Sequence, residues 1–279
     1  MGKRICGVVA AGVLLFLLIS CNATSSLEPD KQETQVALYN VENKDAMILQ
    51  NTAEQVSAAE EIAVVPVCME KEKQPPEEYI IEEFPVLFQM PELPTGCEIT
   101  AMTMVLNYYG YDVDKTTMAA DYLPTVSASQ YYGDDGRLYG GDLRKYFVGD
   151  PFTEGGYICG TEAILNAADA YLQEMGSSMR AVDKTGASPE ELYELVSQDT
   201  PVVVWVTIGM SDRSTPQGWY TESGDYVDWS TNDHGAVMIG YSEDTVTIAD
   251  PISGLVEYSR AQFESVFSSR SHQCVILEA

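Results

Sequence analysis

The sequence predicts an α+β domain in which helices come first and antiparallel strands follow. Over residues 97–108, and again over 160–174, apolar side chains recur at the spacing of one buried helix face. After Pro201 the pattern changes to short β-branched and apolar runs, beginning with VVVWVT at 202–207. A short turn at 242–244 joins two of these runs, so they should pair as antiparallel strands. A helical half followed by an antiparallel half is typical of the α+β class.

The charge of the chain limits its partners. Its 279 residues carry 43 acidic and 15 basic side chains, a net charge of −28. Such a charge argues against nucleic acid as a partner and against docking on an anionic membrane through basic patches. A cationic substrate would suit it, although solubility of an exported protein explains the charge more simply.

Residues 1–20 have the pattern of an export signal. Lys3 and Arg4 precede an apolar core, Val8–Ile19, which is shorter than the ~20 residues that span a bilayer. The sequence Leu-Ile-Ser-Cys at 18–21 resembles a bacterial lipobox, which implies that Cys21 is lipidated and becomes the mature N-terminus. We therefore expect a lipid-anchored protein on the bacterial cell surface. An ordinary signal peptide, which would give a secreted protein, and an uncleaved anchor are the alternatives.

Residues 21–82 predict a tether, and residues 83–279 predict one folded domain. The tether is acidic, with a charged, proline-containing run at 70–78, and we expect most of it to be disordered because it can bury little apolar surface. The remaining residues are numerous enough for one substantial core.

A cysteine marks the start of the first predicted helix. Cys97 follows Pro94 and Gly96, and apolar residues succeed it at spacings of four, seven, eight and eleven: Ala101, Met104, Val105 and Tyr108. A thiol at a helix N-terminus faces the positive end of the helix dipole, which favours the thiolate. The alternative is that Cys97 is a small core residue, since buried free cysteines are common.

The other elements follow from periodicity and from turn residues. Ser188 and Glu191 form a capping-box pattern that opens one helix. We expect a loop over 133–141 and a long aromatic loop over 208–232, with Trp219, Tyr220, Tyr226 and Trp229, which either walls a cleft or packs in the core. Further helices are expected at 115–121, 160–174 and 260–267, and further strands at 234–241, 245–250, 256–258 and 273–277.

The predicted hairpin brings a histidine close to an acid. With the turn at 242–244, paired positions sum to about 486, so Asp250 lies opposite about Ala236 and within two residues of His234. An acid beside a histidine fixes its tautomer and supports the imidazolium. Asp233 is the rival, but adjacent strand residues point to opposite faces. The alternative for His234 is a polar residue that only begins a strand.

Cys97, His234 and Asp250 together suggest a nucleophile, its base and the group that orients the base. Gln89 precedes Cys97, and its amide could donate to an oxyanion beside the Cys97 backbone N–H. For Gln89 the alternative is a surface loop residue. His272 is a weaker alternative base.

These residues match a known family. Residues 84–279 resemble the stand-alone relatives of the bacteriocin-processing, double-glycine cysteine peptidases, the thirty-ninth cysteine-peptidase family. The resemblance implies a papain-like fold with Cys97 as nucleophile, His234 as base, Asp250 as third member and Gln89 as oxyanion donor. The eight-residue gap between Gln89 and Cys97 is wider than is usual in papain-like enzymes. The resemblance to this family rests on four motifs: QMPELPTGCE at 89–98, YFVGDP at 146–151, HGAV at 234–237 and IADP at 248–251.

The resemblance implies hydrolysis of peptide bonds, with a peptide or protein as the substrate. We expect a monomer that needs no cofactor. We also expect no metal site, because the acids at 134, 135 and 142 do not have the spacing of an EF-hand loop that binds calcium. Two alternatives remain: an amide hydrolase or transpeptidase that acts on cell-wall peptides, and an inactive relative that binds peptides. Cys68, Cys159 and Cys274 allow at most one disulfide bond, whose pairing the sequence leaves open.

Overall fold

The computed structural model describes residues 75–279. The predicted export signal, Cys21, Cys68 and most of the predicted tether lie outside the described residues. The folded part begins earlier than the expected boundary at residue 83, because β1 (Tyr79–Ile80) pairs antiparallel with Tyr241 and Gly240. Within residues 75–279, no helix has the length and apolar character needed to cross a membrane.

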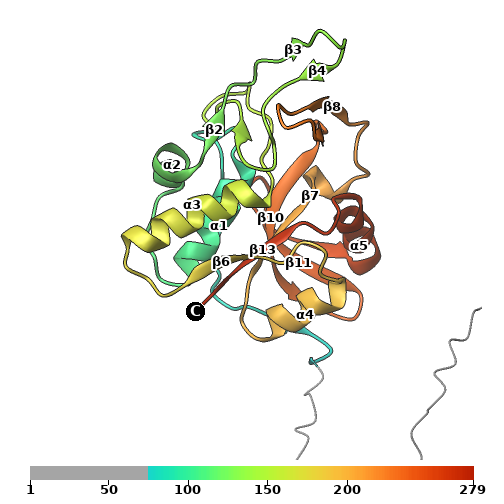
Figure 1. Cartoon of the computed structure of the whole chain (residues 1–279). Helices are drawn as coiled ribbons and strands as arrows, with labels where there is room; N and C mark the ends of the chain where they lie inside the picture. Colours follow the sequence, from blue (N-terminus) through green and yellow to red (C-terminus); the bar gives the residue numbers. More distant parts are fainter. Residues whose placement is uncertain (1–74) are drawn as a thin grey trace, which may run out of the picture. The chain divides into compact units, whose positions relative to one another are not determined.

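A seven-stranded sheet forms the centre of the domain (Figure 1). Its order is β12-β11-β10-β7-β13-β6, and β1 adds to β10. Every strand pair in this sheet is antiparallel, as the sequence predicted. The bounds are β6 Arg180–Asp183, β7 Val202–Thr207, β10 Asp233–Tyr241, β11 Thr245–Asp250, β12 Gly254–Ser259 and β13 Cys274–Glu278.

Helices pack around this sheet. In Figure 1, α1 and α3 lie together on one side of it and α5 lies on the other. The capping box predicted for α4 is present, with Ser188 and Glu191 each bonded to the other's backbone N–H. The bounds are α1 Cys97–Tyr108, α2 Lys115–Thr117 continued by a π-helical turn Met118–Tyr122, α3 Thr161–Glu174, α4 Pro189–Ser197 and α5 Arg260–Ser269.

The register of the central hairpin agrees with the sequence prediction. Val237 lies opposite Ala249 and Met238 opposite Ile248, pairs that sum to 486. An irregularity between Met238 and Gly240 then shifts the register by one residue. The ends of β10 and β11 that carry His234 and Asp250 therefore lie side by side.

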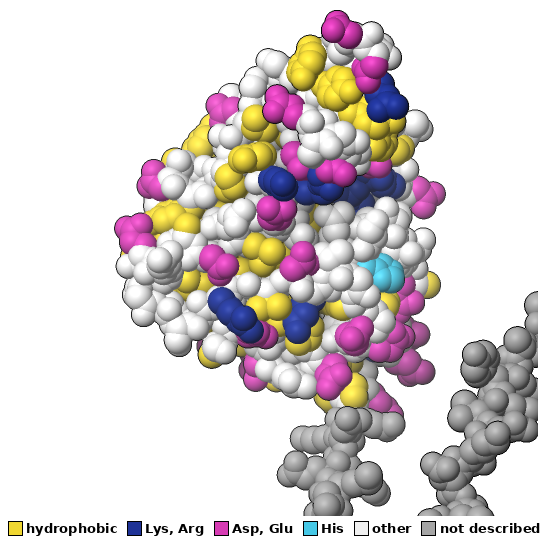
Figure 2. All heavy atoms as spheres, viewed as in Figure 1, with side chains coloured by type: hydrophobic (Ala, Val, Ile, Leu, Met, Phe, Trp, Pro, Cys, Tyr) yellow, Lys and Arg dark blue, Asp and Glu magenta, His cyan; other side chains and the backbone are white. Residues whose placement is uncertain are grey.

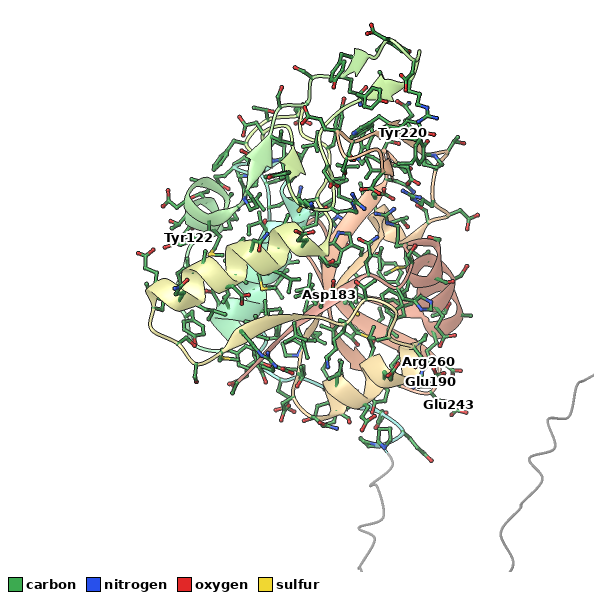
Figure 3. The ribbon with its side chains drawn as sticks, viewed as in Figure 1. Tyr122, Asp183, Glu190, Tyr220, Glu243 and Arg260 are labelled. Carbon is green, nitrogen blue, oxygen red and sulfur yellow. The ribbon has the colours of Figure 1, made fainter. Side chains whose placement is uncertain are left out.

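The two expected loops proved to contain strands. The regions 133–141 and 208–232 contribute to a four-stranded sheet of order β3-β4-β8-β9. A row of tyrosines links its strands, and Figure 3 labels one of them, Tyr220. These strands have only two to four residues, so alternation is too short to read from sequence. Their bounds are β3 Tyr131–Tyr132, β4 Leu138–Tyr139, β8 Gln217–Tyr220 and β9 Tyr226–Trp229. The sequence also did not predict β2 Thr125–Val126, β5 Phe147–Val148 and β6.

Close packing between α1 and β10 depends on a glycine. Residues Cys97 to Leu106 of α1 are all buried, as expected for a helix surrounded by protein. At the start of α1, a Cβ on Gly235 would lie 2.8 Å from the Glu98 Cα and 3.1 Å from its backbone nitrogen. Only glycine therefore allows this strand and this helix to approach so closely.

We expect Gly235→Ala to force the helix and the strand apart. Because the obstructing atoms belong to the Glu98 backbone, relaxation requires movement of α1, and we expect a loss of about 1–3 kcal/mol of stability, the usual cost of overpacking. Thermal or chemical denaturation measures this. Gly155→Ala is the matched control, since its Cβ would meet nothing closer than 3.6 Å. Equal stability of both variants would contradict this account of the packing.

Candidate active site

Cys97 begins α1 directly after a tight turn. The turn is closed by the Gly96 N–H, which donates to the Leu93 carbonyl at 3.1 Å. The Thr100 N–H and hydroxyl both donate to the Gly96 carbonyl, at 3.1 and 2.7 Å, and this starts the helix. The Cys97 side chain is 7% exposed. The predicted position of this thiol at a helix N-terminus is confirmed.

His234 and Asp250 meet at the ends of β10 and β11. Nε2 of His234 lies 3.1 Å from Oδ1 of Asp250, and both side chains are buried. The contact is an ion-pair contact and not a well-aligned hydrogen bond, because Nε2 has no hydrogen-bond partner of regular geometry. The predicted proximity is thus confirmed, and Nδ1 is the ring nitrogen that remains for another partner.

Local backbone groups hold the Asp250 carboxylate in place. Its Oδ1 accepts the N–H groups of Ile252 and Ser253 at 2.7 and 3.0 Å. Burial raises the pKa of Asp250, but His234 and these two N–H groups outweigh burial and hold the pKa below its ordinary value. Asp250 is therefore a carboxylate that can support a protonated imidazole.

Asp233 belongs to a different set of contacts. Its carboxylate oxygens lie 2.8 Å from Arg213 Nε and 3.0 Å from Arg270 Nη1. Asp233 and its neighbour His234 point to opposite faces of β10, as strand geometry requires. The rival orienting acid is thereby occupied elsewhere. His272, the alternative base, stacks on the Phe267 ring with centroids 4.9 Å apart.

Gln89 is buried beside the Cys97 turn. Its Nε2 donates to the carbonyls of Leu93 and Pro94, at 3.2 and 2.9 Å, while its Oε1 has no partner. Its backbone N–H donates to the Pro251 carbonyl, which links it to the Asp250 segment. The alternative of a surface residue is wrong, since Gln89 is 3% exposed. Its role as an oxyanion donor stays a prediction.

The Cys97 helix contacts the His234 strand through Gly235. The Gly235 N–H is directed at the Cys97 sulfur, and Gly235 packs on the backbone of Glu98. The thiol itself donates to Glu98 Oε2 at 3.3 Å. Within residues 75–279, no hydrogen bond joins the Cys97 sulfur to His234. The structure therefore brings the nucleophile candidate to the residue next to the base candidate, with the thiol engaged by a carboxyl.

Glu98 is the site residue that sequence reasoning missed. Its side chain is fully buried, and its Oε1 has no hydrogen-bond partner. Burial raises the pKa of Glu98 to about 7, against smaller opposing effects from nearby N–H groups, the Cys97 thiol and Arg270. An acid inside an otherwise apolar helix pattern was the available signal.

The pKa of the Cys97 thiol differs from the sequence expectation. Burial raises it well above the ordinary value, and the Glu98 charge raises it further, while the Gly235 and Cys97 N–H groups act in the opposite direction. The helix N-terminus alone therefore does not produce a thiolate here. Cys159 and Cys274 are also buried free thiols with raised pKa values.

Other features of residues 75–279 lie apart from this site. These residues contain no group of three or more His, Cys, Asp or Glu side chains arranged to hold a metal ion. A cavity of about 420 Å³ lies at the opposite end of β10, near Tyr241, where Figure 3 labels Glu190, Glu243 and Arg260. None of the candidate catalytic residues lines it.

Comparison with known proteins identifies the family. The model of the Peptidase C39-like family matches residues 81–275. The chain belongs to this family. The resemblance inferred from the sequence motifs is thereby confirmed, and so is the peptidase-like α+β fold.

Two relatives cover most of the folded domain. A crystal structure of a proposed C39-like peptidase from Bacillus anthracis is 31% identical, with a TM-score of 0.64, and the match covers 73% of this chain and 98% of that one. The uncharacterized protein YvpB of Bacillus subtilis (strain 168) is 30% identical over 189 residues, which is 67% of this chain and 71% of YvpB. The similarity to a double-glycine-motif protease of an AMS/PCAT transporter, solved with its leader peptide, is distant: 18% identity, a TM-score of 0.37, and 69% and 89% coverage.

The buried Glu98 of this C39-like domain predicts a pH-dependent stability. Its pKa is about 7 in the folded protein, compared with 4.5 ordinarily, so between these values the folded state keeps a proton that the unfolded chain releases. The contribution of Glu98 to stability is therefore fully present below about pH 4.5 and is lost as the pH rises to 7, by about 3 kcal/mol at about 1.4 kcal/mol per pKa unit. We expect Glu98→Gln to remove this fall.

Urea denaturation of both proteins at pH 5 and pH 8 measures the effect. Other titrating groups contribute equally to the two proteins, so the difference between the proteins isolates Glu98. If the loss of stability between pH 5 and pH 8 were the same with and without the carboxyl, Glu98 would not be the buried acid described here.

Proposed function

We propose that this protein is a cell-surface cysteine peptidase that cleaves peptide bonds with Cys97 as nucleophile. The observation that carries the proposal is the 3.1 Å contact of Asp250 with His234, whose strand packs directly against the Cys97 helix. A base held by a carboxylate beside a helix-initiating thiol is the arrangement that thiol-dependent acyl transfer requires. Membership of the C39-like family supports the same reaction class.

The reaction begins with transfer of the Cys97 proton to His234. Since Nε2 of His234 faces Asp250, Nδ1 is the nitrogen that takes the proton. The thiolate then attacks the peptide carbonyl, and the imidazolium returns the proton to the leaving amine. Water attacks the acyl-enzyme, with His234 again acting as the base, and releases the second product. Asp250 stabilises the imidazolium throughout.

The developing oxyanion needs hydrogen-bond donors at the start of α1. The Cys97 N–H lies in the first turn, where backbone N–H groups have no partner within the helix. Gln89 contributes a second donor if Nε2 exchanges its bond to the Leu93 or Pro94 carbonyl for the oxyanion. Two donors of this kind typically supply a large share of the rate enhancement in acyl transfer.

The charge distribution favours a peptide without strong negative charge as the substrate. Figure 2 shows acidic side chains spread over the face in view, and several, but not all, of the basic side chains gathered in a band across it. Within residues 75–279, Arg144 and Arg213 each pair with two carboxylates and offer little net positive charge. A lipid anchor at Cys21 would hold the domain at the extracellular face of the membrane, where extracellular peptides are available.

We expect Cys97→Ser and His234→Ala each to lower peptide cleavage by about 10³-fold or more, since nucleophile and base act as a unit. Asp250→Asn should cost less, on the order of 10²-fold, because it keeps the size of the side chain but loses support for the imidazolium. Cleavage of a peptide library by the purified full chain measures these losses, with His272→Ala as the control histidine. Unchanged cleavage by Cys97→Ser would exclude the proposed nucleophile.

If the wild-type protein binds library peptides without cleaving any, the inactive peptide-binding alternative is correct. Release of peptides from purified cell-wall material, without cleavage of library peptides, would favour the cell-wall amide alternative. The two assays together therefore separate the three functions that the sequence left open.

The proposed anchor predicts that Cys21→Ser moves the protein out of the membrane fraction. Lipidation adds acyl chains that partition into the bilayer, each contributing about 0.8 kcal/mol per buried CH₂ group. Detergent phase partitioning of bacterial extracts, with N-terminal sequencing of the wild-type protein, measures this. A wild-type N-terminus other than Cys21 would rule out the lipid anchor.

A further inference from the structure

Glu98 is an unusual residue to find beside a nucleophile. It is fully buried, and one of its oxygens has no hydrogen-bond partner. Within residues 75–279, no salt bridge neutralises it; Arg270, whose charge lowers the pKa of Glu98, pairs instead with Asp233. Buried acids that serve only structure are normally paired, because an unpaired buried charge is costly. Glu98 therefore needs another explanation.

Within the described residues, the one side-chain hydrogen bond of Glu98 is made with the candidate nucleophile. The Cys97 S–H donates a hydrogen bond to Glu98 Oε2 at 3.3 Å. The Glu98 backbone and its Cγ pack against Gly235, so the contact between α1 and β10 fixes the start of this side chain beside Cys97. This arrangement holds the thiol proton at a carboxyl and not at an imidazole.

We propose that Glu98 is a positioning residue that controls the thiol of Cys97. While Glu98 is ionised, it accepts a hydrogen bond from the Cys97 S–H and so keeps Cys97 in the resting, protonated form. When Glu98 is itself protonated, its carboxyl no longer draws the thiol hydrogen bond strongly. The thiol is then free to turn to Nδ1 of His234. The proton then passes from sulfur to Nδ1, which leaves a thiolate beside an imidazolium. This role rests on the proposed function, in which Cys97 attacks a carbonyl.

The groups around Glu98 are consistent with such control near neutral pH. Cys97 is on the same helix, Cys159 precedes α3, and Arg270 follows α5, with Asp233 of β10 bound to that arginine. Burial raises the pKa of Glu98 to about 7, so the carboxyl changes charge near neutral pH. A neighbouring negative charge disfavours a thiolate, which gives the ionised carboxyl its restraining effect.

The test is the pH dependence of Cys97 alkylation by iodoacetamide in the full chain, followed at each cysteine by mass spectrometry. In the wild type, the alkylation rate of Cys97 should rise with pH, but this rise should be interrupted by a plateau near pH 7, where Glu98 ionises. Glu98→Gln should lack this interruption and react at least about tenfold faster at pH 8, since a like charge nearby shifts a pKa by one unit or more. Glu92→Gln is the matched control, because Glu92 is half-exposed and pairs with Lys115.

A Glu98→Gln profile that superimposes on the wild-type profile would overturn the proposal, since the interruption would then not arise from Glu98. If this variant fails to fold, ¹³C NMR of glutamate carboxyls in the wild type gives the same answer. One resonance should titrate near pH 7 and shift its midpoint once Cys97 is alkylated; no such resonance, or an unmoved midpoint, would overturn the proposal. Alkylation requires no substrate, so failure here is distinct from failure to cleave peptides.

Discussion

The contact between Gly235 and the backbone of Glu98 is the constraint on which the site depends. It brings the first turn of α1 against the beginning of β10, so that Cys97 and His234 lie on neighbouring segments although 137 residues separate them in the chain. A side chain at position 235 would occupy the space of the helix backbone. The pairing of β10 with β11 then adds Asp250 through its register. Two packing events, one helix–strand and one strand–strand, therefore bring Cys97, His234 and Asp250 together.

Burial is the second physical factor, and it outweighs the helix dipole. A helix N-terminus favours a negative charge by about 0.3–1 kcal/mol at an exposed end. Burial acts on Cys97 in the opposite direction and dominates, so its pKa lies well above the ordinary thiol value. The thiolate of the proposed mechanism must therefore come from an ion pair with His234. Asp250, whose own pKa is held low, supplies the charge that supports this pair.

The sequence predicted those parts of the site that local patterns encode. The turn before Cys97, the apolar face of α1 and the register of the hairpin are all short-range features. The register correctly predicted the contact between His234 and Asp250. The sequence did not reveal the β3-β4-β8-β9 sheet, because its strands are short and two of its segments come from chain regions about 80 residues apart. The environment of Glu98 was also hidden, because its burial is set by Gly235, Cys159 and Arg270, which are distant in sequence.

The close contact between α1 and β10 and the effect of burial both act on Glu98. The same close packing that juxtaposes helix and strand also removes the carboxyl from water, and removal from water moves its pKa into the neutral range. A carboxyl at this position with an ordinary pKa would stay charged and would hold the thiol proton at every physiological pH. Because packing raises that pKa, the resting bond between Cys97 and Glu98 becomes sensitive to pH. The geometry that assembles the candidate site thus also determines when its nucleophile is available.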